Sequence, residues 1–118
     1  MGPAHIIDRL RMICLGFPEA EERETWGEAT FRIRDKIFVI AGVGDDGTVG
    51  CSLKAYAEQE ALLARGEPFY WPPYVGSKRW IGIHLDADTD WDEVAELVED
   101  SYRSTAPKRV IRALDEAG

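Results

Sequence analysis

The spacing of apolar residues changes twice along this chain, and this change limits the fold more than any other feature of the sequence. Apolar side chains recur at helical spacing from residue 3 to about residue 15, where Gly16 and Pro18 end the pattern. β-Branched and aromatic residues then dominate four short stretches, at residues 25–33, 36–43, 48–54 and 79–85. Helical spacing returns after residue 90. The order predicts one helix, at least four antiparallel strands and further helices.

The connections between these elements also have recognisable signals. Arg34-Asp35 can close a tight turn between the first two strands, and the glycine-rich segment 42–47 gives a longer loop before the third. Residues 56–65 favour a short helix, Asp90 with Glu93 indicates another helix start, and Pro107 opens a last one. We expect a single α+β domain over residues 1–118, a two-layer sandwich with one sheet face covered by helices.

The composition excludes several classes of protein. No apolar run approaches the roughly 18 residues of a membrane-spanning helix, and the N-terminus lacks the pattern of a secretion signal. We therefore expect a cytoplasmic protein with no membrane partner. Cys14 and Cys51 lie among apolar or small residues without a spacing motif, which predicts reduced, structural thiols. The formal net charge of −8 repels polyanions overall and weighs against unspecific nucleic-acid binding.

Two motif-like stretches do not have the context that their chemistry requires. Residues 42–47 match G-x-G-x-x-G, but a strand pattern follows where a dinucleotide site needs a helix N-terminus, so we interpret them as a hairpin loop. Acidic residues alternate from Asp86 to Asp92 like calcium ligands, yet Trp91 and Leu97 occupy the positions that need glycine and glutamate. We expect a solvated connection and no metal site there.

Catalytic constellations are equally poorly supported. The serines have no identifiable base partner, and His5 and His84 lack a second ligand at metal-binding spacing. The glutamates between residues 19 and 24 are typical of a solvated loop rather than of an acid–base pair. We therefore predict no catalytic residues, no cofactor and a non-enzymatic protein.

Cations and aromatic residues around the predicted strands are the feature that indicates binding. Arg32 and Arg34 share one strand face, because side chains alternate with period two. A surface of this kind can hold phosphates and stack bases or another flat ligand on its aromatic rings. The candidate binding residues are Arg32, Arg34, Lys36, Lys54, Tyr74, Lys78 and Arg79.

The alternative is that the large aromatic residues are core and the cations are ordinary solvated side chains. On this interpretation the core contains Trp26, Phe31, Phe38 and Trp80. The segment 69–74 fits it less well, since it holds four aromatic residues and two prolines, more than a plain connector requires.

The chain also resembles the MmcQ/YjbR family over nearly its whole length. The resemblance rests on Pro18-Glu19-Ala20-Glu21-Glu22, Thr25-Trp26-Gly27-Glu28-Ala29-Thr30-Phe31, Lys36-Ile37-Phe38, Lys54, Tyr74, Lys78-Arg79-Trp80-Ile81 and Ser101-Tyr102. It implies a compact fold similar to the secretion-chaperone and frataxin-like topologies. Members are often described as DNA-binding proteins because of a wing-like hairpin, which here would carry Arg32, Arg34 and Lys36.

Two hypotheses about function follow, and an enzyme of unrecognised type, to which no residues are assigned, is kept as a third in reserve. The first is DNA binding through the basic sheet-edge residues, which predicts salt-sensitive affinity. The second is an adaptor that binds a protein or a small aromatic ligand through the aromatic segment 69–74.

Overall fold

The computed structural model describes residues 2–117, and within them the chain forms an α+β fold. The helices are α1 (Pro3–Leu15), α2 (Gln59–Arg65), the short 3₁₀ helix η1 (Gly76–Lys78), α3 (Trp91–Thr105) and α4 (Lys108–Ala117). The strands are β1 (Ala20–Thr25), β2 (Glu28–Ile33), β3 (Lys36–Val43), β4 (Val49–Lys54), β5 (Phe69–Tyr70) and β6 (Trp80–Leu85).

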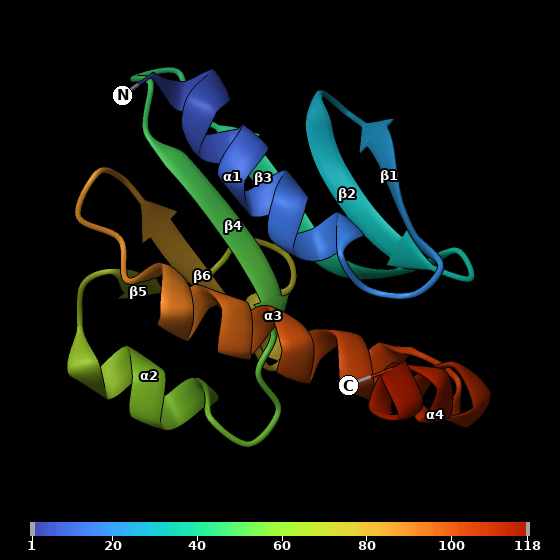
Figure 1. The fold of residues 1–118 in the computed structure, drawn as a ribbon. Coiled ribbons are helices and arrows are strands. Elements are labelled where there is room, and N and C mark those ends of the chain that lie inside the picture. The colour runs from blue at the N-terminus through green and yellow to red at the C-terminus, as the bar shows by residue number, and fades with distance from the viewer. Residues whose placement is uncertain (1, 118) are drawn as a thin grey trace.

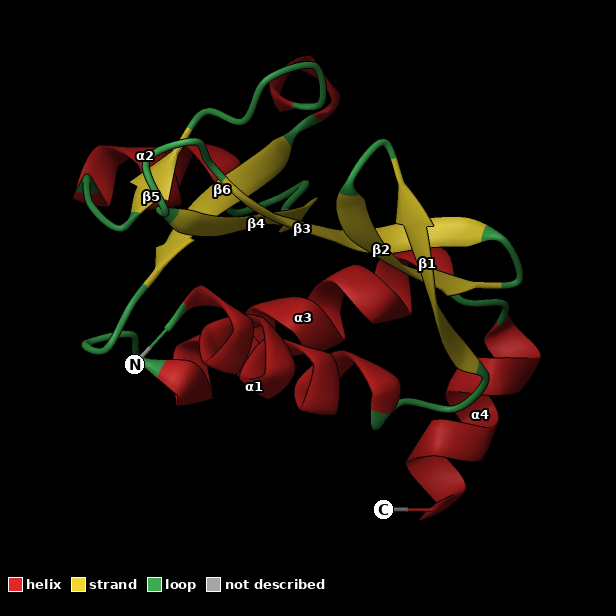
Figure 2. Cartoon of the chain, turned by 90° about the horizontal axis from the view of Figure 1, so that it is seen from above, coloured by secondary structure: helices red, strands yellow, loops and turns green. Residues whose placement is uncertain are grey.

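The six strands form one antiparallel sheet in the order β1-β2-β3-β4-β6-β5. α1 and α3 lie side by side across one face of this sheet (Figure 1), and the view from above places both helices on the same side of the strands (Figure 2). The predicted two-layer sandwich is therefore confirmed. The opposite face of the sheet carries neither of these two helices.

Strand alternation decides which side chains enter the core. Ile33, Val39, Leu53 and Ile81 are fully buried towards the helices. A β-bulge in the pairing of β2 with β3 places Phe38 in the core as well, next to Val39 in the sequence. The ring of Phe38 packs edge-on against Tyr102 of α3, with 5.3 Å between centroids, so the bulge lets β3 fill the space beneath the helix.

β1 corrects one sequence-based expectation. The glutamate-rich segment before residue 25 is typical of a solvated loop, but Ala20–Thr25 pairs with Glu28–Ile33 along its whole length. Trp26 and Gly27 form the intervening two-residue turn, both at positive φ (55° and 81°). Because β1 is an edge strand with polar side chains on both faces, its sequence lacks the apolar alternation by which strands are recognised.

The other local predictions are largely confirmed. Arg34 and Asp35 both adopt positive φ in the β2–β3 turn, and the glycine-rich 42–47 loop leads into β4. The side chain of Asp90 accepts a hydrogen bond of 3.1 Å from the backbone N–H of Glu93 and caps α3. α2 begins only at Gln59, three residues later than predicted. The described helices include none that is long and apolar enough to cross a membrane.

Both cysteines are free and buried. Burial is the main cause that raises the pKa of Cys14, and it raises the pKa of Cys51 to about 12. The thiols therefore stay protonated near neutral pH, as expected for structural cysteines.

Candidate functional site

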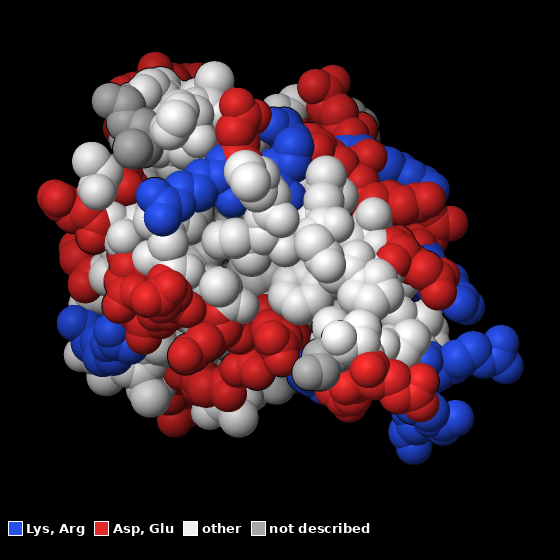
Figure 3. All heavy atoms as spheres, in the orientation of Figure 1, with Lys and Arg blue, Asp and Glu red and all other residues white. Residues whose placement is uncertain are grey.

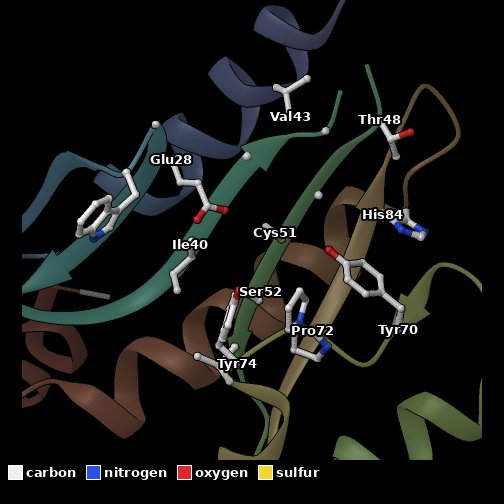
Figure 4. Close-up of a pocket in the computed structure, with 17 residues that line it drawn as sticks. Glu28, Ile40, Val43, Thr48, Cys51, Ser52, Tyr70, Pro72, Tyr74 and His84 are labelled. Carbon is white, nitrogen blue, oxygen red and sulfur yellow. The ribbon is translucent and has the colours of Figure 1, made fainter. Parts of the chain in front are cut away.

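The face of the sheet opposite α1 and α3 contains a hollow of about 610 Å³. Its floor is formed by β3 and β4 together with His84 near the end of β6, one wall is the β1–β2 turn, and the other is the connector from Tyr70 to Val75 (Figure 4). The volume lies within the range of small-molecule sites in proteins. This hollow, called the cleft below, brings together segments separated by more than 40 residues in the sequence.

Glycines create the floor of the cleft. Gly42 of β3 and Gly50 of β4 are cross-strand partners, and Gly82 of β6 lies next to Ser52 on the far side of β4. A Cβ at Gly82 would be 2.4 Å from the ring of Tyr70, and one at Gly50 would be 2.6 Å from the Tyr70 hydroxyl oxygen. Tyr70 can therefore lie flat across β6 and β4 only because these positions lack side chains.

Two aromatic residues stand on opposite rims of the cleft, almost fully exposed. Trp26 is 97% exposed at the β1–β2 turn, and Tyr74 is 96% exposed in the connector. Both have positive φ, 55° for Trp26 and 67° for Tyr74, a region that bulky residues rarely adopt. Each rim thus carries a large aromatic residue in an unfavourable backbone conformation, and the exposed ring gains no burial that would offset this cost.

Polar groups line the cleft between these rims. The carboxylate of Glu28 lies over Gly42, with Oε2 at 3.0 Å from the position that a Cβ there would take. The ring of Tyr70 stacks on His84 with 4.2 Å between centroids, and His84 Nδ1 lies 3.0 Å from a carboxylate oxygen of Glu67. Burial is the main cause that raises the pKa of Tyr70, so its hydroxyl stays protonated near neutral pH.

The structure divides the aromatic residues that the sequence grouped together. Phe31, Phe38 and Trp80 are buried, as the core interpretation predicts. The same interpretation is wrong for Trp26. This residue lies in a two-residue turn at the edge of the sheet, so its side chain packs against neither the sheet nor the helices and is exposed to solvent. In the segment 69–74 Phe69 is buried, Tyr70 is half-buried, and Trp71 and Tyr74 are exposed.

The predicted cations gather mainly at one end of the sheet rather than in the cleft. β2 ends there at Ile33, β3 begins at Lys36, β4 ends at Lys54 and β6 begins at Trp80. Arg34, Lys36, Lys54, Lys78 and Arg79 lie in or beside these strand ends, and Arg32 is one residue inside β2. Of the predicted site residues, only Tyr74 lines the cleft.

Several of these cations already have partners within the fold. Arg34 makes two hydrogen bonds to the carboxylate of Glu19, at 2.7 and 3.2 Å. The guanidinium of Arg32 donates to two threonine hydroxyls of β1 and β2, and that of Arg79 donates to the carbonyl of Tyr56 at 2.7 Å. Three arginines are thus engaged in holding turns and strands.

The lysines differ from the arginines in this respect. Within residues 2–117 no ion pair involves Lys36, Lys54 or Lys78. Burial first, and the charge of Lys36 second, lowers the pKa of Lys54. Lys36 and Lys78 are exposed, so they are the most available cations at this end of the sheet.

The helix-bearing side shows no continuous basic surface. Viewed onto α1 and α3, acidic side chains gather over α2 and the first part of α3, while basic side chains lie along α1 and project beside α4 (Figure 3). No group of three or more histidine, cysteine, aspartate or glutamate residues suited to a metal ion is found among residues 2–117. The cleft on the opposite side is therefore the better candidate for a binding site.

Sequence reasoning missed Glu28 and His84 as cleft residues, whereas Tyr70 belongs to the aromatic segment 69–74 that it had singled out. One signal was present, because Gly42, Gly50 and Gly82 interrupt strand patterns, and glycine inside a strand often marks a place where another group approaches the backbone. The pairing of β4 with β6 brings Gly50 and Gly82 beneath the Tyr70 ring. No local sequence pattern indicates this pairing.

Comparison with known proteins agrees with the fold. A family model described as YjbR matches residues 15–104, a range that includes every residue lining the cleft. A crystal structure of a protein from Pseudomonas syringae superposes with a TM-score of 0.65 at 21% sequence identity, covering 89% of this chain and 99% of its own. At this identity the likeness shows the fold alone. No curated protein matches the chain.

Proposed function

This chain belongs to the YjbR family, and we propose that it is a binding protein whose cleft takes a small ligand with a flat ring. The observation that carries the proposal is the pair of exposed aromatic residues, Trp26 and Tyr74, on opposite rims of one hollow. Their rings offer two faces on which a flat ligand can stack, an interaction worth roughly 1–3 kcal/mol per ring in nucleic-acid-binding proteins.

The backbone at these two residues supports a functional interpretation. A non-glycine residue in a sparsely populated backbone region costs of the order of 1–3 kcal/mol and persists where the surroundings hold it. Trp26 gains no burial that would offset this cost, since it is 97% exposed. A ligand that covers both rings would supply the missing burial of apolar surface.

Nuclear magnetic resonance of the indole N–H groups tests the proposal. The chain has four tryptophans, so a ¹⁵N-labelled sample gives four side-chain signals, and Trp26→Phe assigns the one at the rim. Titration with riboflavin, adenosine, guanosine and pterin should shift the Trp26 signal in a saturable way with at least one ring compound. Trp91, which lies under Arg9 on the helix side, serves as the internal reference and should not move. No shift with any ring compound would refute the proposal.

Nucleic acid is a second candidate, favoured by the gathering of cations at one end of the sheet. Lys36 and Lys78 are exposed there and make no ion pair within residues 2–117. Such cations would contact phosphates, and the affinity would fall steeply with salt. The net charge of −8 makes low ionic strength the condition in which binding is to be sought.

Fluorescence anisotropy with labelled single- and double-stranded DNA tests this candidate. Saturable binding at low salt should weaken in the double variant Lys36→Ala/Lys78→Ala, and the salt slope on duplex DNA should fall by about 0.9 for each phosphate that the variant no longer neutralises. The matched control is Lys108→Ala/Arg112→Ala on α4, which removes the same charge elsewhere. An equal weakening in both double variants would indicate unspecific attraction, and no binding at low salt would remove this candidate.

A further inference from the structure

We infer that the ligand of the cleft presents two adjacent N–H donors beside a carbonyl oxygen, the edge shared by guanine and pterin rings. This inference rests on the proposed function and adds the chemistry of the ligand's edge to it. It is carried by Glu28 and Tyr70, whose polar ends point into the same space over β4 from opposite sides (Figure 4).

Glu28 supplies the acceptor. It is the first residue of β2 after the Trp26 turn, and its side chain lies across Gly42, with Cγ at 3.3 Å and Oε2 at 3.0 Å from the position of a Cβ there. Within residues 2–117 its carboxylate takes part in no ion pair and accepts no side-chain hydrogen bond. Two carboxylate oxygens at the wall of the cleft are thus free to accept from a ligand.

Tyr70 supplies the donor. Its ring crosses Gly82, stacks on His84 and brings the hydroxyl over Gly50. The hydroxyl is protonated, because burial raises the pKa of Tyr70, and it makes no hydrogen bond with another residue in the described part of the chain. It can therefore donate to a ligand oxygen.

The register of the sheet sets the spacing between these two groups. Gly42 and Gly50 are direct cross-strand partners, and Cβ positions of such partners lie roughly 4.5–5.5 Å apart. The carboxylate of Glu28 and the hydroxyl of Tyr70 lie over these two positions, about the width of one ring edge apart. A ring that is stacked on the rims would meet both groups with its edge.

The order of donors and acceptors selects among ring edges. A carboxylate binds two parallel N–H donors in a fork, and a neighbouring hydroxyl donates to a carbonyl oxygen. The guanine and pterin edges carry a carbonyl, a ring N–H and an amino group in that order. Adenine would set a ring nitrogen lone pair against the Glu28 carboxylate, and a phosphate or carboxylate would meet its negative charge directly.

Calorimetric and NMR titrations of the full 118-residue chain with guanosine, pterin, inosine and adenosine test the inference. Inosine is guanosine without the amino group, so it should bind about tenfold more weakly, as expected for the loss of one hydrogen bond to a charged acceptor. Adenosine should bind more weakly still. Comparing the affinities for guanosine and pterin shows which of these two rings the cleft prefers.

Two variants make the test specific to Glu28. Glu28→Gln should lower the affinity for guanosine or pterin by about tenfold and bring guanosine close to inosine. Glu24→Gln is the matched control, since alternation along β1 puts Glu24 on the same side as Glu22, which pairs with Arg11 of α1 away from the cleft. It should leave every affinity unchanged.

The possible failures are distinguishable. Binding of riboflavin or adenosine that shifts Trp26, without any preference for guanosine or pterin, would overturn this inference and leave the proposed function standing. Guanosine binding that is unchanged in Glu28→Gln would overturn it in the same way. A Trp26 signal that responds to none of the compounds would overturn both.

Discussion

Replacing Gly82 with alanine tests whether the bare backbone of β6 holds the Tyr70 ring in the cleft. A Cβ at Gly82 would lie 2.4 Å from Cε2 of Tyr70, whereas ordinary contacts begin at 3.4 Å, so the ring must retreat by about 1 Å. This movement disturbs the 4.2 Å stack on His84. Overpacking of this kind costs about 1–3 kcal/mol, while alanine in a strand gains roughly 0.5–1 kcal/mol over glycine. We expect a net decrease of about 1 kcal/mol in the free energy of unfolding.

Urea denaturation in two backgrounds measures the effect. In the Tyr70→Ala background the same Gly82→Ala change meets no ring, so the strand preference of alanine should appear alone as a gain of roughly 0.5–1 kcal/mol. The change of sign between backgrounds is the diagnostic result of this double-mutant cycle. An equal decrease in both backgrounds, or a more stable Gly82→Ala variant in the presence of Tyr70, would refute this packing of the Tyr70 ring.

Three further predictions concern the rim, the core and the thiols. Trp26→Asn should raise the free energy of unfolding in urea by about 0.5–1 kcal/mol, because asparagine accepts the positive φ of the turn, and should weaken ligand binding in the calorimetric titration; a decrease of stability would show that the positive φ of Trp26 is not a source of strain. Ser101→Ala should cost about 2 kcal/mol in the same assay, because the buried Ser101 hydroxyl donates to the carbonyl of Phe38 at 2.6 Å and accepts from the amide of Lys54 at 3.0 Å; a cost below about 0.5 kcal/mol would contradict this. The pKa of Cys51 is raised from 9.0 to about 12 in the folded chain, so only the unfolded thiol ionises between these values, and stability should fall as pH rises above about 9, less steeply in Cys51→Ala; equal slopes would contradict it.

Local signals in the sequence were sufficient for much of the fold. The Arg34-Asp35 turn, the cap at Asp90 and the alternation of β3 and β4 each depend on residues close together in the chain, so they could be predicted from spacing and turn chemistry. β1 was missed because its side chains are polar on both faces, and its pairing with β2 is visible only when the strands are placed side by side.

The candidate site depended far less on local signals. Tyr74 could be read from the sequence, but Glu28 and Tyr70 line the same cleft only because β2 pairs with β3, β3 with β4, and β6 lies between β4 and β5. The sequence by itself determined the elements, their order and the face of each strand that is apolar, since these follow from nearest neighbours and from the period of the backbone. The tertiary structure alone decided that Trp26 stands outside the core and that Gly42 and Gly50 from two strands lie together in the floor of the cleft, because register and strand order are set by the packing of the whole sheet.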